Sequence, residues 1–212
     1  MTTTDSSDLD DLLQRVQRGE QRALVALFTR YRDRLRKKVR LRLDWRLQGR
    51  IDPSDVLQDA YLDVARRAGE YVANPSVPVF LWLRLITGQR LMALHRQHLG
   101  AQMRDAGQEV SLHRGAWPQA TSASLAALLL GRFTSPTQAA QRAEMQIRLQ
   151  EVLNAMDPID REVLTLRHFE ELSNVETAQV LGIQKAAASN RYLRALKRLK
   201  DTLASMPGFF DY

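Results

Sequence analysis

The stretch Leu172-Ser-Asn-Val-Glu-Thr-Ala-Gln-Val-Leu-Gly-Ile183, continued by Gln184-Lys-Ala-Ala-Ala-Ser-Asn-Arg-Tyr-Leu-Arg-Ala-Leu-Lys-Arg-Leu-Lys200, decides the fold of the C-terminal part of this chain. Ser173 is a favourable N-cap, and Glu176 three residues later completes a capping box, so a helix begins here. Gly182 can adopt the left-handed conformation that ends a helix, which keeps this helix short. The pattern predicts a helix-turn-helix whose second helix is basic and free of acids up to residue 200.

The second of these helices has one apolar stripe. Helical spacing places four residues on the side that faces the first helix: Ala188, Tyr192, Ala195 and Leu199. The other faces carry side chains that can enter a major groove, namely Lys185, Ser189, Asn190, Leu193 and Arg194. Basic amphipathic helices are also common as solvated surface elements, so DNA binding is here the favoured of two interpretations.

Composition favours an all-α protein with a polyanionic partner. Of the 212 residues 44% are hydrophobic but only 7% aromatic, helix formers dominate, and runs of β-branched residues are absent. The net charge of +7 and the pI near 10.1 suit nucleic acid, with an anionic membrane as the competing polyanion. The lack of cysteine excludes disulfides and thiolate zinc sites.

Neither a signal peptide nor a membrane span is indicated. Residues 1–11 are polar and acidic, the reverse of a secretory signal. The apolar run 79–86 is interrupted by Arg84, and the run 125–130 has only six residues, so neither can cross a membrane. We expect a cytoplasmic protein with no membrane partner.

Periodicity and breakers predict two small helical domains joined by a flexible linker. The predicted domains are residues 1–104 and 144–206, with a linker at 105–143 and a tail at 207–212. Within the linker, the apolar run 125–130 is expected to form a short helix pinned on a partner or on its own domain. The other predicted helices lie at 8–18, 20–47, 52–68, 79–98, 144–156 and 159–169, with a loop at 69–78.

Residues 30–50 hold ten basic residues and two acidic ones. Arginine stems can cover apolar surface while their charged ends stay in water, which gives a purely structural interpretation. A phosphate or an acidic protein is the equally favoured alternative.

Two separate regions resemble one protein family. The first region matches in Gly19-Glu20, Ala23, Leu27-Phe28, Tyr31, Leu35, the segment Asp55-Val-Leu-Gln-Asp-Ala-Tyr61, Trp82-Leu83, Ile86, Gln89 and Arg96. The second matches in Asp157-Pro-Ile-Asp-Arg-Glu-Val-Leu164, Ala178, Gly182-Ile183, Asn190-Arg191, Ala195 and Lys197-Arg198-Leu199. The chain resembles bacterial sigma factors of the extracytoplasmic-function type, which keep only the second and fourth conserved regions.

The resemblance implies a protein without a catalytic centre, cofactor or metal, which lends promoter specificity to core RNA polymerase. It implies that Asp55, Gln58 and Asp59 contact the β′ clamp helices through charged hydrogen bonds. The acids Glu162, Glu170 and Glu171 would face the β flap. An anti-sigma factor or another regulator is a conceivable further partner, and we expect a monomer when the protein is free.

For the minus-ten element, the resemblance implies base capture and strand separation by the N-terminal domain. Tyr71, Asn74 and Ser76 are the candidates in the loop, because they offer a ring face, an amide and a hydroxyl. The candidates for backbone and base-edge contacts on the following helix are Arg84, Gln89, Arg90 and Arg96. Trp82 is expected in the core.

For the minus-thirty-five element, the resemblance implies insertion of the second helix of the helix-turn-helix into the major groove. Asn190 can pair bidentately with adenine, Lys185 or Arg194 can bind guanine or phosphate, and Leu193 can meet a thymine methyl. Arg191, Lys197 and Arg198 are expected to hold phosphates and so to give affinity without sequence information.

Three other interpretations compete. His95 and His98 have the spacing of a metal site, but polar surface histidines are the better account. Asp52, Asp55 and Asp59 resemble the carboxylates of a metal-dependent nuclease, without a nearby partner motif. The chief rival is a helix-turn-helix repressor or activator that binds duplex DNA as a dimer, although such a regulator does not need the segment 55–61.

Overall fold

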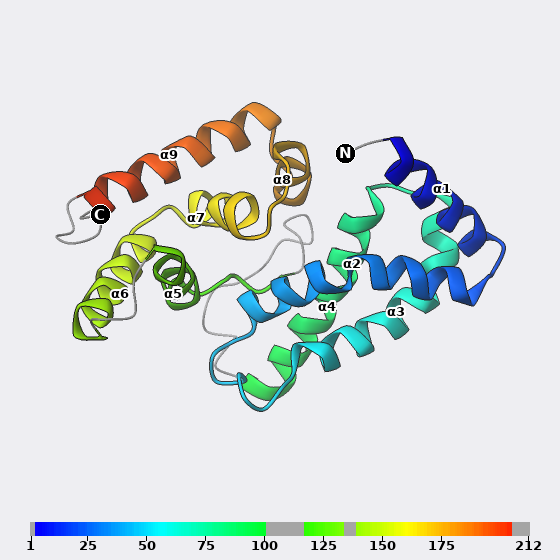
Figure 1. Cartoon of the computed structure of the whole chain (residues 1–212), viewed down its shortest axis with the longest axis horizontal. Helices are drawn as coiled ribbons and strands as arrows, with labels where there is room; N and C mark the ends of the chain where they lie inside the picture. Colours follow the sequence, from blue (N-terminus) through cyan, green and yellow to red (C-terminus); the bar gives the residue numbers. More distant parts are fainter. Residues whose placement is uncertain (1–2, 101–116, 134–138, 205–212) are drawn as a thin grey trace. The chain divides into compact units, whose positions relative to one another are not determined.

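The computed structural model describes residues 3–100, 117–133 and 139–204, and every regular element in these ranges is a helix (Figure 1). The expected all-α class is therefore confirmed for the described residues. The chain divides into two compact units, Met1–Pro118 and Gln119–Tyr212, which are described separately below.

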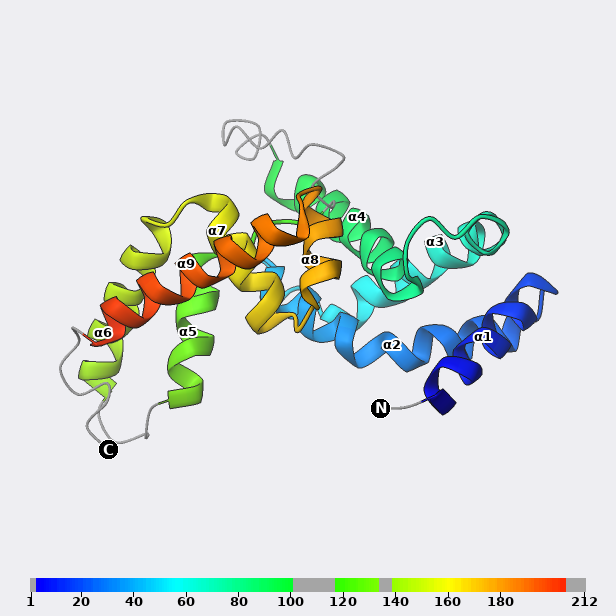
Figure 2. The ribbon, with the colours of Figure 1, turned by 90° about the horizontal axis from the view of Figure 1, so that it is seen from above.

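The described residues of the N-terminal unit form four helices: α1 (Thr3–Gln17), α2 (Gln21–Arg42), α3 (Pro53–Ala73) and α4 (Val79–Leu99). Helix α2 contacts the other three, as Figure 2 shows for its course beside α1 and α3. The core between α2, α3 and α4 is built from Leu27, Leu35, Val39, Val56, Leu57, Val64, Leu83, Ile86 and Leu91, all of them buried. The first half of α4 is buried on almost every side.

Three helix ends of this unit differ from the sequence prediction, each by five residues. Helix α1 begins at Thr3 instead of residue 8. Helix α2 stops at Arg42 instead of 47, because Leu43 takes an extended conformation and the Asp44 side chain accepts a hydrogen bond from the backbone N–H of Arg46 at 2.9 Å. Helix α3 continues to Ala73, so residues 69–73 are helical and not part of a loop. Asn74 ends it directly before Pro75, where the proline ring disfavours the helical conformation.

The start of α3 is as predicted. The Asp52 carboxylate accepts a hydrogen bond from the backbone N–H of Ser54 at 2.6 Å. Pro53 occupies the first turn, where backbone N–H groups have no acceptor within the helix, so the lack of an N–H in proline costs no hydrogen bond. The hydrogen bond from Ser54, helped by the charges of Arg36 and Arg32, lowers the pKa of Asp52.

The N-terminal unit extends beyond its predicted end at residue 104. Trp117 is only 3% exposed, and its indole Nε1–H donates to the backbone carbonyl of Arg84 at 2.6 Å. The guanidinium of Arg42 donates to the carbonyl of Pro118 at 2.8 Å. Residues 117 and 118, expected within the linker 105–143, thus belong to the packing of this unit.

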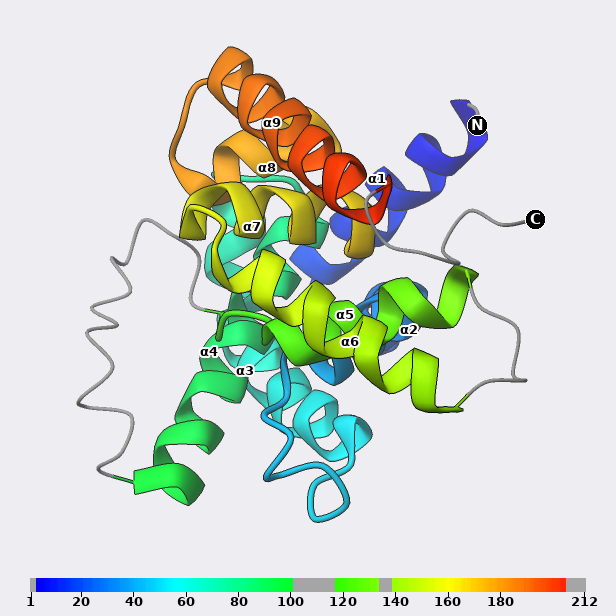
Figure 3. The ribbon, with the colours of Figure 1, turned by 90° about the vertical axis from the view of Figure 1, so that its left-hand side faces the viewer.

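The C-terminal unit contains α5 (Ser122–Phe133), α6 (Ala139–Asn154), α7 (Pro158–Leu164), a π-helical turn η2 (Thr165–Phe169), α8 (Asn174–Leu181) and α9 (Lys185–Ala204). Helices α5 and α6 lie side by side (Figure 3), with Leu125, Leu129, Leu149 and Leu153 buried. The apolar run 125–130 is therefore a helix packed on its own domain, one of the two outcomes that the sequence allowed.

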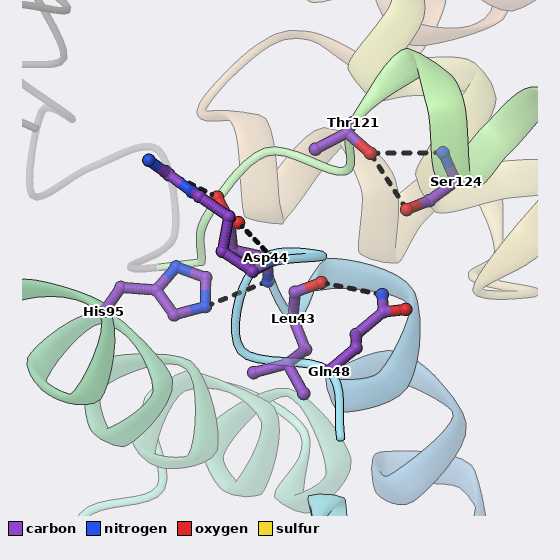
Figure 4. A network of polar contacts seen from close by, with 7 residues as sticks. Leu43, Asp44, Gln48, His95, Thr121 and Ser124 are labelled. Atoms are coloured by element: carbon purple, nitrogen blue, oxygen red, sulfur yellow. Dashed lines mark hydrogen bonds and ion pairs between the residues drawn. The ribbon is translucent and has the colours of Figure 1, made fainter. Parts of the chain in front are cut away.

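Local hydrogen bonds hold the start of α5. The hydroxyl of Thr121 accepts the backbone N–H of Ser124 at 3.1 Å, as in an N-cap (Figure 4). Ser122 then donates to Asn154 of α6 at 2.7 Å, and Arg161 of α7 donates to Ser122 at 3.1 Å. These contacts tie α5 to the helices that precede α8 and α9.

Candidate nucleic-acid interface

The helix-turn-helix forms as predicted. Ser173 Oγ accepts the N–H of Glu176 at 3.2 Å, and the Glu176 carboxylate accepts the N–H of Ser173 at 2.7 Å, which completes the capping box. Gly182 ends α8 in the left-handed conformation, with φ 63° and ψ 34°. The Asn174 amide donates to the carbonyl of Lys185 at 2.9 Å and so ties the start of α8 to the start of α9.

Helix α9 buries the predicted stripe and presents the predicted groove-facing side chains. Ala188, Ala195 and Leu199 are buried, and Tyr192 is half-buried. Of the predicted DNA-contacting residues, Ser189 is half-buried and six are exposed: Lys185, Asn190, Leu193, Arg194, Lys197 and Arg198. Leu193 is 63% exposed although it is apolar, so it is available for an apolar contact with a partner, such as a thymine methyl.

Arg191 departs from this pattern. Its Nη1 lies 2.6 Å from Oδ1 of Asp160 and 3.5 Å from Oδ1 of Asp157, both at the start of α7. Arg194 reaches the same Asp160 oxygen only at 3.8 Å and stays exposed. A groove of about 510 Å³ runs along this side of α9, lined by acids of α7 and by Arg194, Lys197 and Arg198.

The segment 55–61 presents the predicted polar face. Asp55 and Gln58 are exposed on α3, whereas Val56, Leu57 and Ala60 between them are buried. Asp59 is already paired, because Arg90 of α4 donates to its Oδ2 through Nη2 at 2.5 Å and through Nε at 3.0 Å.

The basic segment 30–50 has features of both interpretations that the sequence left open, the structural one and the contact with a phosphate or an acidic protein. Its inner residues lie against aromatic rings: Arg34 and Lys38 are 3.6 and 5.2 Å from the ring centre of Phe80, and Arg42 is 5.8 Å from that of Trp117. Its outer residues Arg36, Lys37, Arg40 and Arg50 line a groove of about 770 Å³ that also includes Asp33, Asp52 and Asp55. The segment thus covers apolar surface on one side and carries an exposed charge cluster on the other.

Tyr71 does not lie in a loop. It is buried in the last turns of α3, its ring is stacked on Trp82 with 4.3 Å between ring centres, and its hydroxyl donates to the carbonyl of Val77 at 2.8 Å. Burial raises the pKa of Tyr71 to about 12. Both the ring face and the hydroxyl are therefore in use inside the unit, and Trp82 is in the core as expected.

The remaining minus-ten candidates fall into two groups. Asn74, Ser76 and Arg96 are exposed. Others are engaged within the unit: Gln89 accepts from Arg67 at 2.8 Å, Arg90 is paired with Asp59, and Arg84 is buried with its guanidinium 5.0 Å from the ring centre of Trp117. In the C-terminal unit Glu170, expected on the surface that faces the β flap, is buried as well.

His95 is a buried residue and not the surface histidine that the sequence suggested. Its Nε2 accepts the backbone N–H of Asp44 at 3.3 Å, as Figure 4 shows, and burial lowers its pKa although the nearby Asp44 opposes the shift. In the same loop the Gln48 amide donates to the carbonyl of Leu43 at 3.2 Å. His98 is exposed.

The described ranges contain neither a cluster of metal-ligating side chains nor a helix able to cross a membrane. Across residues 3–100, 117–133 and 139–204 no three His, Asp or Glu side chains are grouped as a metal site requires. Within the same ranges no helix has both the length and the apolarity to cross a membrane.

Sequence reasoning missed two features of the site. One is Asp160 as a partner of α9, since an acid near a helix start is usually explained by the helix dipole alone. The other is Trp117, whose signal was present: a large aromatic residue followed by proline in an otherwise small and polar stretch.

Residues 146–199, from α6 to near the end of α9, match the family model described as sigma-70, region 4. The RNA polymerase sigma-E factors of Streptomyces avermitilis and Streptomyces coelicolor are each 39% identical to the chain over 57 residues, 27% of this chain and 32% of the relative. The chain thus spans about a third of the length of these relatives. The ECF RNA polymerase sigma factor BldN of Streptomyces coelicolor is 22% identical over 196 residues, 92% of this chain and 66% of that relative.

A solved structure, that of CnrH in complex with the cytosolic domain of CnrY, shares the fold with a TM-score of 0.53 at 22% identity. The match covers 92% of this chain and 96% of that chain. The helix-turn-helix geometry agrees with the match of residues 146–199 to sigma-70, region 4, and over most of its length the chain is similar to an ECF RNA polymerase sigma factor.

Proposed function

We propose that the protein is an alternative sigma factor, which binds core RNA polymerase and directs promoter-specific transcription initiation. The observation that carries the proposal is the exposed face of α9, where an amide, an apolar side chain and several cations lie together within the region 4 match. Such a face suits a major groove, because the amide reads bases while the cations hold phosphates. The protein itself performs no chemistry, needs no cofactor and works in the cytoplasm with the polymerase.

In this proposal α9 reads the minus-thirty-five element. Asn190 pairs with adenine, Leu193 contacts a thymine methyl, and Arg194 or Lys185 binds guanine or phosphate. Lys197 and Arg198 hold the DNA backbone. Their exposure supports these roles, and Ser189 at the edge of the face makes a lesser contact.

The polymerase-binding face is on α3. Asp55 and Gln58 are exposed one turn apart and suit basic residues of the β′ clamp helices. Asp59 has a second role, because its pair with Arg90 fixes α3 against α4.

For the minus-ten element, the exposed residues Asn74, Ser76 and Arg96 are the primary candidates. Gln89 and Arg90 would have to exchange their present partners for DNA. Tyr71 and Arg84 are buried, so in this proposal they stabilise the surface that binds the minus-ten element and do not contact the DNA themselves.

A regulator that covers the free protein is a further part of the proposal. The solved relative CnrH is described in complex with the cytosolic domain of CnrY, and the likeness in fold makes an anti-sigma factor a reasonable partner here too. The free protein is expected to be monomeric.

The test combines polymerase binding with transcription. The full-length chain should co-purify with core polymerase and support run-off transcription from only a subset of a promoter library. Asp55→Lys should abolish both activities, whereas Glu70→Lys, an exposed acid on the same helix, should leave both intact.

The rival function predicts the opposite result. A dimeric repressor or activator would bind one duplex tightly and specifically without polymerase. Such binding, together with an unimpaired Asp55→Lys variant, would refute the sigma-factor proposal.

A further inference from the structure

Arg191 lies on the side of α9 that faces α7, although it stands in the middle of the proposed reading helix. Its neighbours one turn away, Ala188 and Ala195, are buried, while Asn190 and Leu193 on other faces of the helix are exposed. The Arg191 side chain is only 26% exposed. It therefore points into the domain and away from the face that α9 presents to solvent.

Two acids hold the Arg191 guanidinium in this position. Asp160 is 2.6 Å away and has a side chain only 15% exposed, and Asp157 is 3.5 Å away. Asp157 is itself fixed, since its carboxylate accepts the N–H of Ile159 at 2.8 Å at the start of α7. The anchor for Arg191 is thus a helix start whose geometry is set by its own cap.

Two further contacts hold the same stretch of α9. The guanidinium of Arg167 lies 5.1 Å from the ring centre of Tyr192, the residue directly after Arg191. The Asn174 amide donates a hydrogen bond to the carbonyl of Lys185 in the first turn of α9. Helix α9 is therefore held from α7, from η2 and from α8 along its first half.

A phosphate is a poor additional partner for Arg191. It would have to approach two carboxylates within 3.5 Å of the same guanidinium nitrogen and would be repelled by both. Lys197 and Arg198 are exposed, so a phosphate can approach them from solvent.

We propose that Arg191 is a positioning residue, which sets the orientation of α9 through Asp160 and Asp157 and does not bind a phosphate. The proposal rests on the proposed function, because it assumes that α9 reads DNA. It predicts that loss of Arg191 weakens the binding of the exposed face of α9 to the major groove as a whole.

The first test is the salt dependence of promoter binding by the full-length chain with core polymerase. A lost phosphate contact lowers the slope of log affinity against log salt by about one unit. Arg198→Ala, the matched control, should show that decrease. Arg191→Ala should weaken binding about tenfold with an unchanged slope. A decrease of one unit for Arg191→Ala would overturn the proposal.

The second test is a double-mutant cycle with Asp160→Asn. If Arg191 acts through Asp160, Arg191→Ala should cost little further affinity once Asp160 has been changed. Equal losses in the two backgrounds would contradict the proposal. The reversed pair Asp160→Arg with Arg191→Asp should recover most of the lost affinity, which a direct phosphate contact cannot explain.

All binding is measured at a temperature where circular dichroism shows every variant to be folded, so a loss of affinity is not a loss of fold. The same cycle measured by thermal unfolding reports the ion pair without any DNA. If the wild type failed to bind promoter DNA with polymerase, the proposed function would be refuted. The unfolding cycle would still measure the ion pair between Arg191 and Asp160. If the wild type bound and the unfolding cycle showed no coupling, only the positioning role would fail.

Discussion

The two units differ in where some of their basic residues lie. In the C-terminal unit, the cations of α9 mostly face solvent, and the helix is buried along one stripe. In the N-terminal unit, Lys38, Arg42 and Arg84 are buried, and aromatic rings lie beside them. Helical spacing therefore predicts which side chains of α9 are exposed but not which side chains of α4 are, because α4 is surrounded by protein on most sides and has no single solvent face.

This contrast predicts that the same type of substitution has different consequences in the two units. A buried polar or aromatic residue of the N-terminal unit should affect folding first. A polar residue of α9 should affect DNA selectivity first. The four predictions below test that division in order of decreasing effect.

Trp117→Ala should destabilise the N-terminal unit by about 3–5 kcal/mol, because a large buried ring is removed from between Arg42 and Arg84. The matched control is Trp45→Ala, since Trp45 is 68% exposed and its loss should change stability by no more than about 0.5 kcal/mol. Urea unfolding of the full-length chain measures both. Equal effects would show that residues 117 and 118 are not part of this unit.

Asn190→Ala should remove about 1–3 kcal/mol of discrimination at one or two positions of the upstream promoter element, because it removes the side chain that can pair with adenine. Arg198→Ala should lower activity on all cognate promoters without changing the order of preference. Transcription from promoters mutated singly across that element gives both profiles. Two identical profiles would mean that α9 does not present Asn190 to the bases.

Ser173→Ala should destabilise the C-terminal unit by about 1 kcal/mol, because the N–H of Glu176 loses its acceptor at the start of α8. Ser76→Ala, at an exposed serine outside any helix, is the control. Thermal unfolding compares the two variants. A neutral Ser173→Ala would show that packing alone fixes the start of α8.

The smallest expected effect is a pH dependence that comes from His95. Burial favours the neutral ring and holds its pKa below the ordinary value of 6.5, so the unfolded chain takes up a proton first as the pH falls. The stability of the N-terminal unit should therefore be complete above about pH 6.5 and decrease below it. Melting temperatures across this range should lose the decrease in His95→Gln and keep it in His98→Gln. A decrease that survives in His95→Gln would assign it to other groups.

The sequence by itself determined the class of the fold and the local ends of several helices. Ser173, Glu176 and Gly182 define α8, and Asp52 with Pro53 starts α3, as predicted. Capping depends on hydrogen bonds among three or four consecutive residues, so it can be read without knowledge of the rest of the fold. The exposed face of α9 could be predicted from the sequence as well, because in a helix with one buried stripe the spacing shows which residues lie on the other faces.

Only the tertiary structure decided which polar and aromatic side chains are used inside the protein. Arg84 meets Trp117 33 positions further along the chain, Arg191 meets Asp160 across 31 positions, and His95 meets Asp44 across 51. No local pattern names the partner in such a pair, because the two members lie in segments far apart in the sequence. Their roles follow from the packing of distant helices, which brings donor and acceptor together and removes them from water.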